Sequence, residues 1–404
     1  MSSPGGGTAR CAVAEASRPN GAVSSPRGSA ADPEEQDTAF GRQLPTGVGL
    51  FTSQSVGFER SRLTAQAIES QLYDSKRQLF GICQWWTCHR WEALWPVAGA
   101  WSAAVSLAAV SPAAPLARRL EHFVGGLAQY HPHGVAAIEG EGPVGFRARV
   151  VGPLPRRAEV FFDDNAWVAL ALLGLYDLTG DGRCLDLASR VTEFVLNGWS
   201  TDRSWAHPGG IPWRQAPPST TRNTCANAPA AEAAVALYLR TRDPRWLDAG
   251  RRVYEWVRTA LGDRLHLYAD HLDPDGRVTT TLWSYLQGSM IGAGVLLARA
   301  TGEEHYLDEA TSTARAAIDR FGTEALLAQP AAFNAVYFRN LSLLHRVRAV
   351  PALHAVMADY GDRAWDLHRD ASSGLFAERG MSPLNATAAM VEIYALLAGA
   401  EPHP

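Results

Sequence analysis

The sequence predicts an all-α fold, an (α/α)6 barrel in which six helical hairpins form a toroid. Three similar segments begin at Thr179, Thr241 and Thr301, 62 and 60 residues apart. Each segment ends an apolar helical pattern with a tight turn and begins an amphipathic one. A fixed period of this size, with one helical hairpin in each repeat, is typical of helical arrays and toroids.

The same rhythm extends to both sides and predicts twelve helices in six pairs. In chain order we expect helices at residues 58–74, 91–109, 113–129, 162–178, 182–198, 223–240, 243–260, 282–300, 303–320, 331–347, 351–369 and 383–399. Strand signals are scarce. The best of them are short, at Glu159–Phe162 and Arg264–Tyr268.

The two helices of each pair differ in polarity. The second is rich in Ala, Gly and aromatic residues on almost all faces, as in Ala226–Leu237, and a helix that is apolar on most faces is buried. The first carries charged residues on one side, as in Asp248–Glu255, and should face water. Six inner helices surrounded by six outer helices make the predicted barrel.

Length and composition fit one large globular domain. The chain has 404 residues, 47% apolar and 19% charged, with a net charge of −4. Residues 1–45, rich in Gly, Ser, Pro and Ala, should form a disordered leader, and residues 46–404 a single barrel domain. No basic stripe interleaved with aromatic residues is present, so nucleic acid is not an expected partner. We expect a monomer.

The sequence also bears on the cellular compartment of the protein. It contains no apolar run of 18 residues that would span a membrane and no secretory signal, so we expect a cytoplasmic protein. The five cysteines lack disulfide-like regularity, which favours free thiols in a reduced compartment. Cys83, Cys88 and His89 have no second ligand pair at suitable spacing. No metal site and no cofactor are therefore predicted.

The connections between helices indicate where function lies. Those from an inner helix to the next outer helix are short turns, whereas most of those from outer to inner are long, at 130–161, 199–222, 261–281 and 370–382. Long loops in a compact domain usually carry function. All of them lead to N-terminal ends of inner helices, so the active site is predicted there.

Two adjacent acids, Asp163 and Asp164, begin one of these inner helices. Helix capping is the simpler interpretation, because Asp is favoured at helix starts. However, the pair follows Phe161 and Phe162, which should shield it from water, and neighbouring carboxylates repel, so their proton affinities separate. One ionised and one protonated carboxyl group are what glycoside hydrolysis requires. Adjacent residues suit the short separation of retaining enzymes better than the longer one of inverting enzymes.

The other segments at the predicted mouth supply aromatic and amide side chains. Aromatic faces stack on sugar rings, and amides pair with hydroxyl groups. We predict substrate contacts at Trp86, Trp95, Asn165, Trp213, Asn223, Asn227, Tyr285, Gln287, Asn334 and Asn385.

Residues 58–399 resemble glycoside hydrolase family 76, the α-1,6-mannanase family. The motifs that carry the resemblance are Asp163–Trp167 (Asp-Asp-x-Ala-Trp), Gly209–Trp213 (Gly-Gly-Ile-x-Trp), Arg222–Asn227 and the Tyr-x-Gln-Gly turn Tyr285–Gly288. The resemblance implies an (α/α)6 barrel and a retaining mechanism on α-1,6-linked mannan or manno-oligosaccharides. It makes Asp163 the nucleophile and Asp164 the general acid/base, with transglycosylation as a variant of the same chemistry.

Two alternatives stay open. A sugar isomerase similar to N-acylglucosamine 2-epimerase shares this fold class but needs His bases on the inner helices, which carry almost none apart from His345. A non-catalytic carbohydrate-binding barrel would keep the aromatic residues of the mouth and tolerate loss of either aspartate.

Overall fold

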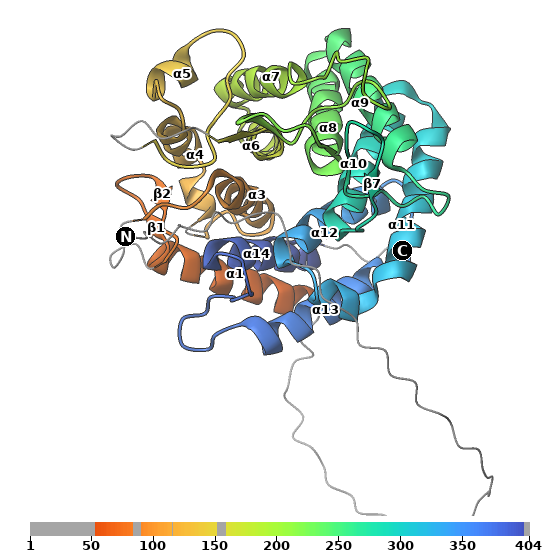
Figure 1. Ribbon diagram of the computed structural model, residues 1–404. Coiled ribbons are helices and arrows are strands. Elements are labelled where there is room, and N and C mark those ends of the chain that lie inside the picture. Colours follow the sequence, from red (N-terminus) through yellow and green to blue (C-terminus); the bar gives the residue numbers. More distant parts are fainter. Residues whose placement is uncertain (1–52, 84–89, 115, 152–158, 400–404) are drawn as a thin grey trace, which may run out of the picture. The chain divides into compact units, whose positions relative to one another are not determined.

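A computed structural model describes residues 53–83, 90–114, 116–151 and 159–399, which are mostly helical (Figure 1). The predicted leader, residues 1–45, and the predicted contact Trp86 lie outside these ranges. The helices are α1 (Ser53–Gln71), α3 (Leu94–Val110), α4 (His122–Leu127), α5 (Val135–Glu139), α6 (Phe162–Thr179), α7 (Gly182–Leu196), α8 (Thr224–Thr241), α9 (Pro244–Leu261), α10 (Ser284–Thr301), α11 (Glu304–Leu327), α12 (Ala331–His345), α13 (Leu353–His368) and α14 (Pro383–Ala398), with 3-10 turns η1 (Ala117–Arg119) and η2 (Ala128–Tyr130).

Six of these helices form a closed inner ring. In the order α3, α6, α8, α10, α12 and α14, each packs against the next, and α14 returns to pack against α3 (Figure 1). Outside the ring, α1 packs on α14, α7 on α6, α9 on α8 and α11 on α10, while α13 contacts both α12 and α14. The predicted (α/α)6 barrel is confirmed.

Burial follows the predicted division into inner and outer helices. In α8 every residue from Thr224 to Leu237 is buried, and in α10 every residue from Ser284 to Leu297. The outer helix α9 instead buries one stripe and leaves its charged residues at the surface. Small side chains on the inner helices permit this close packing, because they let neighbouring helix backbones approach each other.

The 60-residue repeat has a physical basis in the turns that end the inner helices. Thr179 Oγ1 donates to the carbonyl four residues earlier (2.8 Å) and accepts from the amide of Asp181 (3.2 Å). Gly180 between them adopts a left-handed conformation, with φ of 71°. The same hydrogen bonds recur at Thr241–Asp243 and Thr301–Glu303. Each turn satisfies carbonyl and amide groups that a helix end leaves unpaired.

The expected helix at 113–129 is wrong in this form. The segment consists of the short pieces η1 and α4 and the beginning of η2. Gly125 and Gly126 lie inside α4, and because consecutive glycines are poor helix formers the segment has little tendency to form one long helix. They are needed here because a Cβ on Gly126 would lie 2.5 Å from the carbonyl oxygen of Gln78, in the turn between two short strands.

Short antiparallel strands brace the loops at one end of the barrel. They are β1 (Tyr73–Asp74), β2 (Leu79–Phe80), β3 (Val160–Phe161), β4 (Arg214–Ala216), β5 (Arg222–Asn223), β6 (His271–Leu272) and β7 (Val278–Thr279), paired as β1–β2, β3–β4 and β5–β6–β7. The strand predicted at Glu159–Phe162 is confirmed as β3. The one predicted at Arg264–Tyr268 is wrong, because that segment turns and contributes only a single bridge between Tyr268 and Gly262.

Two further findings concern cysteines and membranes. Cys83 is disulfide-bonded, so the expectation of free thiols is wrong for this residue, whereas Cys184 and Cys225 are buried thiols that form no disulfide. Within the described ranges, no helix combines the length and the apolar character needed to cross a membrane.

We expect Gly288→Ala to destabilise the barrel. A Cβ on Gly288 in α10 would lie 2.7 Å from the Cα of Tyr337 in α12, so the two backbones would have to separate. Overpacking of this kind costs about 1–3 kcal/mol in the free energy of unfolding, which denaturant titration measures. Gly99→Ala in α3 is the matched control, because no atom lies within 4 Å of its Cβ position. Equal destabilisation by the two substitutions would contradict the close approach of α10 and α12.

Candidate active site

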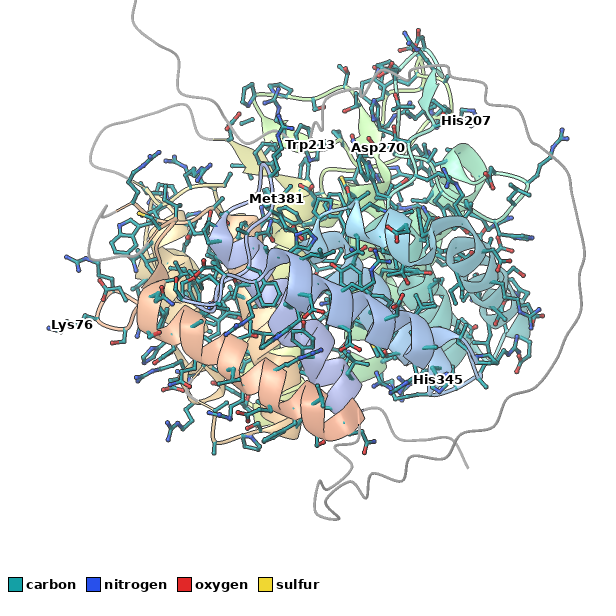
Figure 2. The ribbon with its side chains drawn as sticks, turned by 90° about the horizontal axis from the view of Figure 1, so that it is seen from below. Lys76, His207, Trp213, Asp270, His345 and Met381 are labelled. Atoms are coloured by element: carbon teal, nitrogen blue, oxygen red, sulfur yellow. The ribbon has the colours of Figure 1, made fainter. Side chains whose placement is uncertain are left out.

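The long loops gather at the end of the barrel where the inner helices begin. Figure 2 shows Trp213, Asp270 and Met381, from three different loops, at one end of the helices, and His345, at the last residue of α12, at the other. The connections at the far end include the two-residue turns 180–181, 242–243 and 302–303. The loop end is therefore the mouth where the sequence predicts the site.

Asp163 lies in the first turn of α6 and is almost completely buried, with 8% of its surface exposed. Its Oδ2 accepts a hydrogen bond from Trp213 Nε1 (3.0 Å), and its Oδ1 accepts one from the backbone amide of Asp164 (3.0 Å). Burial raises the pKa of Asp163 to about 6, although these two donors and the Cys225 thiol oppose the shift by stabilising the carboxylate.

Asp164 is in a different environment. It keeps partial contact with solvent, and no hydrogen bond to its carboxylate occurs among the described residues. Desolvation, followed by the negative charge of Asp163, raises the pKa of Asp164 well above its ordinary value, and the Arg149 charge offsets only part of this. Near neutral pH the pair can therefore hold one carboxylate, at Asp163, and one protonated acid, at Asp164.

Trp213 is fixed by its own loop. Its carbonyl accepts from the amide of Phe162 (3.0 Å), and its ring packs at 4.8 Å from the ring of Phe161. Gly209 and Gly210 precede it with φ of 105° and 79°. Residues other than glycine rarely adopt these angles. The glycines thus let the loop turn so that the indole N–H reaches Asp163.

The buried guanidinium of Arg222 holds this loop in place. Arg222 has no exposed surface, and its guanidinium donates to the carbonyls of Ala206, His207 and Gly209 from the loop and to that of Asp273. The same group lies over the ring of Trp256 at 5.4 Å. Because Arg cannot lose its proton in proteins, this charge needs its carbonyl partners and ties the loop to them.

Three of the amides predicted as substrate contacts share another arrangement. Asn227 Oδ1 accepts from the amide of Ile211 (2.7 Å), and its Nδ2 donates to the carbonyls of Ile211 and Asn223. Asn165 makes the same three bonds with Phe146 and Phe161, and Gln287 makes them with Tyr268 and Trp283.

These three amides have zero exposed surface, and both N–H groups of each are donated to backbone. We therefore assign Asn165, Asn227 and Gln287 to holding the mouth loops in place. This assignment corrects the direct sugar contacts that the sequence analysis predicts for them. Asn334 is also fully buried, and its amide group bonds Ser284 and the carbonyl of Leu326.

The remaining predicted contacts lie close to the mouth. Tyr285 is buried and stacks on Phe333 at 4.1 Å, and Trp95 lies 5.9 Å from the same ring. Asn223 Oδ1 is buried and has no hydrogen-bond partner among the described residues. The structure therefore leaves Trp95 and Asn223 as candidates for ligand contact.

A small cavity lies within the barrel between α3, α6, α12 and α14. Its lining includes Trp95 and Asn385, which the sequence predicts, and also Trp167, Arg339 and Glu392, which it does not. Sequence reasoning likewise misses Arg149 and Cys225, whose charge and thiol act on the two acids. Arg149 lies in no motif, and Cys225 occupies an unspecified position of the Arg222–Asn227 motif, so only the folded chain shows that both act on the acids. Among the described residues, no cluster of His, Cys, Asp and Glu could hold a metal ion.

Comparison with known proteins gives one family match. The sequence model described as glycosyl hydrolase family 76 matches residues 147–344, a segment that includes both acids and most of the inner helices. No curated protein sequence matches the chain.

Several solved structures share the fold. A GH76 α-mannanase of Bacteroides thetaiotaomicron is 20% identical with a TM-score of 0.71, and the match covers 85% of this chain and 95% of that one. An inactive α-1,6-mannanase variant of Salegentibacter sp., in complex with α-1,6-mannotetrose, is 18% identical with a TM-score of 0.66, covering 85% and 98%. A D-mannose isomerase is 11% identical with a TM-score of 0.59, covering 87% and 99%.

Trp213→Phe should raise the pKa of Asp163 above about 6. The indole N–H stabilises the ionised form, so its removal favours the protonated one, while phenylalanine keeps most of the packing against Phe161. NMR titration of carboxyl carbons in both proteins measures this shift. Trp365→Phe, which changes a tryptophan in the outer helix α13, is the control. An unchanged or lowered pKa in Trp213→Phe would show that the indole does not support the carboxylate.

Proposed function

We propose that the chain is a retaining glycoside hydrolase of family 76, whose sequence model matches residues 147–344, and that it acts on α-1,6-linked mannan or manno-oligosaccharides. The observation that carries this proposal is the unequal environment of two adjacent acids at the mouth. Asp163 receives two hydrogen bonds that favour its carboxylate, whereas Asp164 receives none from the described residues and is held protonated by burial and by its neighbour.

The proposed reaction has two displacements at the anomeric carbon. In the first, the Asp163 carboxylate forms a bond to that carbon while the bond to the leaving oxygen breaks, and Asp164 gives its proton to that oxygen. In the second, Asp164, now a carboxylate, takes a proton from water. The water oxygen then attacks the same carbon and releases Asp163. Two inversions restore the original configuration, and an acceptor sugar in place of water gives transglycosylation.

The adjacency of the acids supports retention. Consecutive Cα atoms lie about 3.8 Å apart, and retaining enzymes hold their carboxyl groups about 5–5.5 Å apart, whereas inverting enzymes need about 6.5–9.5 Å to admit a water. Asp163 and Asp164 leave the same helical turn, so their side chains suit the shorter separation.

The choice of substrate rests on the family and on the related structures. The Salegentibacter α-1,6-mannanase was inactive after replacement of two consecutive aspartates and was captured with α-1,6-mannotetrose. This chain has two consecutive aspartates at the start of an inner helix, and the indole of Trp213 donates a hydrogen bond to the first of them. We therefore propose the same class of glycan.

The isomerase alternative is less well supported, although a D-mannose isomerase shares the fold. Such chemistry needs a base such as His at the centre of the barrel. Among the described residues of the inner helices the only histidine is His345, which lies at the end opposite the mouth (Figure 2). A binding module without activity would not need the separate proton affinities of the two acids.

Asp163→Asn and Asp164→Asn should each reduce cleavage of α-1,6-mannotetraose by at least about 100-fold, because each removes one chemical role. Both variants should still bind the tetrasaccharide, as calorimetry can measure. NMR of the wild-type reaction should show the α-anomer of the product first. A wild type that binds without cleaving would support the binding module, and initial release of the β-anomer would contradict retention.

The pH profile should be bell-shaped. Activity should rise with pH as Asp163 ionises, with its acidic limb near pH 6, and fall at higher pH as Asp164 loses its proton. Because the two acids interact, both limbs report the pair rather than single residues. Measurement of kcat/KM across pH 4–10 tests this expectation. An acidic limb near pH 4 would show that the carboxylate is not desolvated in the working enzyme.

A further inference from the structure

Three consecutive inner helices begin in the same way at the mouth. The residue before α6, α8 and α10 has an extended backbone in each case, and the residue four positions later carries the buried amide that holds a mouth loop. In this common register the second residues of the three helices are equivalent, and these are Asp163, Cys225 and Tyr285. All three are buried. The repeat that builds the barrel therefore gives Cys225 in α8 the position that the proposed nucleophile has in α6.

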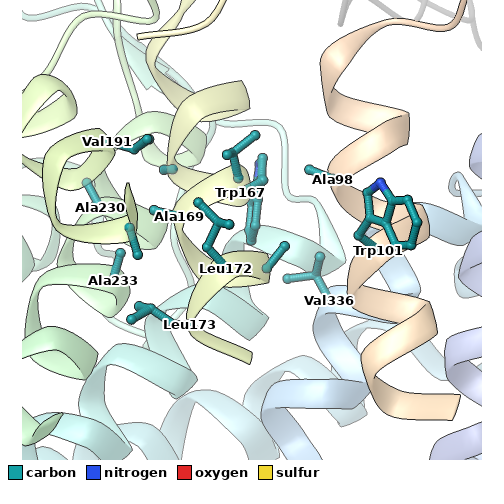
Figure 3. Packing of buried hydrophobic residues seen from close by; sticks show 14 of the residues in the cluster. Ala98, Trp101, Trp167, Ala169, Leu172, Leu173, Val191, Ala230, Ala233 and Val336 are labelled. Carbon is teal, nitrogen blue, oxygen red and sulfur yellow. The ribbon is translucent and has the colours of Figure 1, made fainter. Parts of the chain in front are cut away.

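Packing between α6 and α8 brings these two positions together. The helices are neighbours in the inner ring, and Figure 3 shows Ala230 and Ala233 of α8 next to Leu173 of α6. Small side chains at such a contact let the two helix backbones approach closely. At the mouth end of the same interface, the thiol of Cys225 donates a hydrogen bond to the carboxylate of Asp163.

The carboxylate of Asp163 relies on neutral donors. Its two oxygens accept from the indole of Trp213 and from the amide of Asp164, and the thiol is the third donor. Two carboxylate oxygens offer about four acceptor positions, so all three donors can be accommodated. The charged groups of the loop before α6, Arg149 and Glu159, act on Asp164. Asp164 itself opposes a second negative charge on its neighbour once it is ionised. Each neutral donor therefore matters for the charge state of Asp163.

A thiol makes this contact a weak one, because S–H is a poor hydrogen-bond donor. A hydroxyl group in the same place would hold the ionised carboxylate more strongly, since hydrogen bonds to charged groups strengthen with the donor, and a methyl group would not hold it at all. The donor at residue 225 therefore controls how readily Asp163 gives up its proton, with both acids unchanged.

We propose that Cys225 is a positioning residue for the nucleophile, and that its thiol sets the acidic limit of the pH range in which the enzyme works. The contact holds the carboxylate of Asp163 ready at the mouth, between the indole of Trp213 and the start of α8. The role of Asp163 as nucleophile rests on the proposed function, whereas the contact between the two side chains does not.

Two substitutions at residue 225 should shift the pKa of Asp163 in opposite directions. Cys225→Ala removes the donor and should raise the pKa, and Cys225→Ser supplies a stronger donor and should lower it, each by about half a pH unit to one pH unit. Carboxyl-carbon NMR titration measures both shifts in an Asp164→Asn background, where Asp163 titrates without its interacting neighbour. Cys184→Ala is the matched control, because this buried thiol lies in the outer helix α7 and forms no disulfide, and it should leave the pKa unchanged.

Opposite shifts separate a hydrogen bond from packing. If Cys225 only filled space, the two substitutions would act alike, since alanine and serine are both smaller than cysteine. An unchanged pKa in Cys225→Ala, or a pKa that is not lowered in Cys225→Ser, would overturn the inference. Equal melting temperatures of the variants and their parent establish that they fold. Should Cys225→Ala not fold, the result for Cys225→Ser decides alone.

Activity tests the consequence for the reaction. In proteins that keep Asp164, the acidic limb of kcat/KM on α-1,6-mannotetraose should move to higher pH in Cys225→Ala and to lower pH in Cys225→Ser, and stay in place in Cys184→Ala. A limb that does not follow the NMR shifts would overturn the role of Cys225 in the reaction. A wild type that cleaves nothing would instead sink the hydrolase proposal, and the NMR shifts would still decide whether the thiol supports the carboxylate.

Discussion

The chemistry of the site depends on keeping one carboxylate charged at a desolvated helix start. Loss of water disfavours the ionised form of Asp163, and the groups that oppose this are few. One is the amide of Asp164, which the helix fixes in place. Another is the indole of Trp213, which lies fifty residues further along the chain. The proton affinity of the nucleophile is therefore set by the position of a loop as much as by the acids themselves.

That loop is positioned by buried polar groups rather than by apolar packing alone. Arg222 donates hydrogen bonds to four backbone carbonyls, three of them in the loop. Asn227 bonds both the backbone amide and the backbone carbonyl of Ile211. A buried polar network stabilises only when its members are satisfied, and a partly satisfied one is costly. Small displacements of the loop would leave a cation and an amide unpaired in the interior. The loop consequently has one favourable position, in which the indole N–H of Trp213 reaches the carboxylate of Asp163.

The sequence predicts the barrel well because the barrel is encoded locally. The repeated turns at Thr179, Thr241 and Thr301 contain their own capping groups, so three short motifs set the period. The roles of the amides could not be predicted in the same way. Asn and Gln donate to and accept from a sugar hydroxyl or a peptide group equally well. Only the folded structure shows that the groups bonded by Asn165 and Gln287 are backbone.

The ion pair in the cavity lining also cannot be predicted from the sequence, for a different reason. Arg339 and Glu392 belong to two helices, and in each of these a lone charged residue within an apolar pattern reads as an irregularity. Their pairing depends on the closure of the ring between α12 and α14, which no local pattern specifies. The shortness of α4 is equally hard to predict, because the turn that crowds its two glycines comes from an earlier hairpin.

Two features of the barrel interior depart from the rules that favour stable helices and apolar cores. Glycine within a helix costs about 1 kcal/mol relative to alanine, yet Gly99 has room for a larger side chain. A buried ion pair is often no more stable than apolar residues of the same volume, yet Arg339 and Glu392 form such a pair in the lining of the cavity between α3, α6, α12 and α14. Local rules are most often broken at functional sites. Both departures line one cavity, and Trp167 connects that cavity to the face of α6 that carries Asp163. The interior one helical turn below Asp163 is therefore not packed for stability alone, in contrast to the close-packed contacts between neighbouring inner helices.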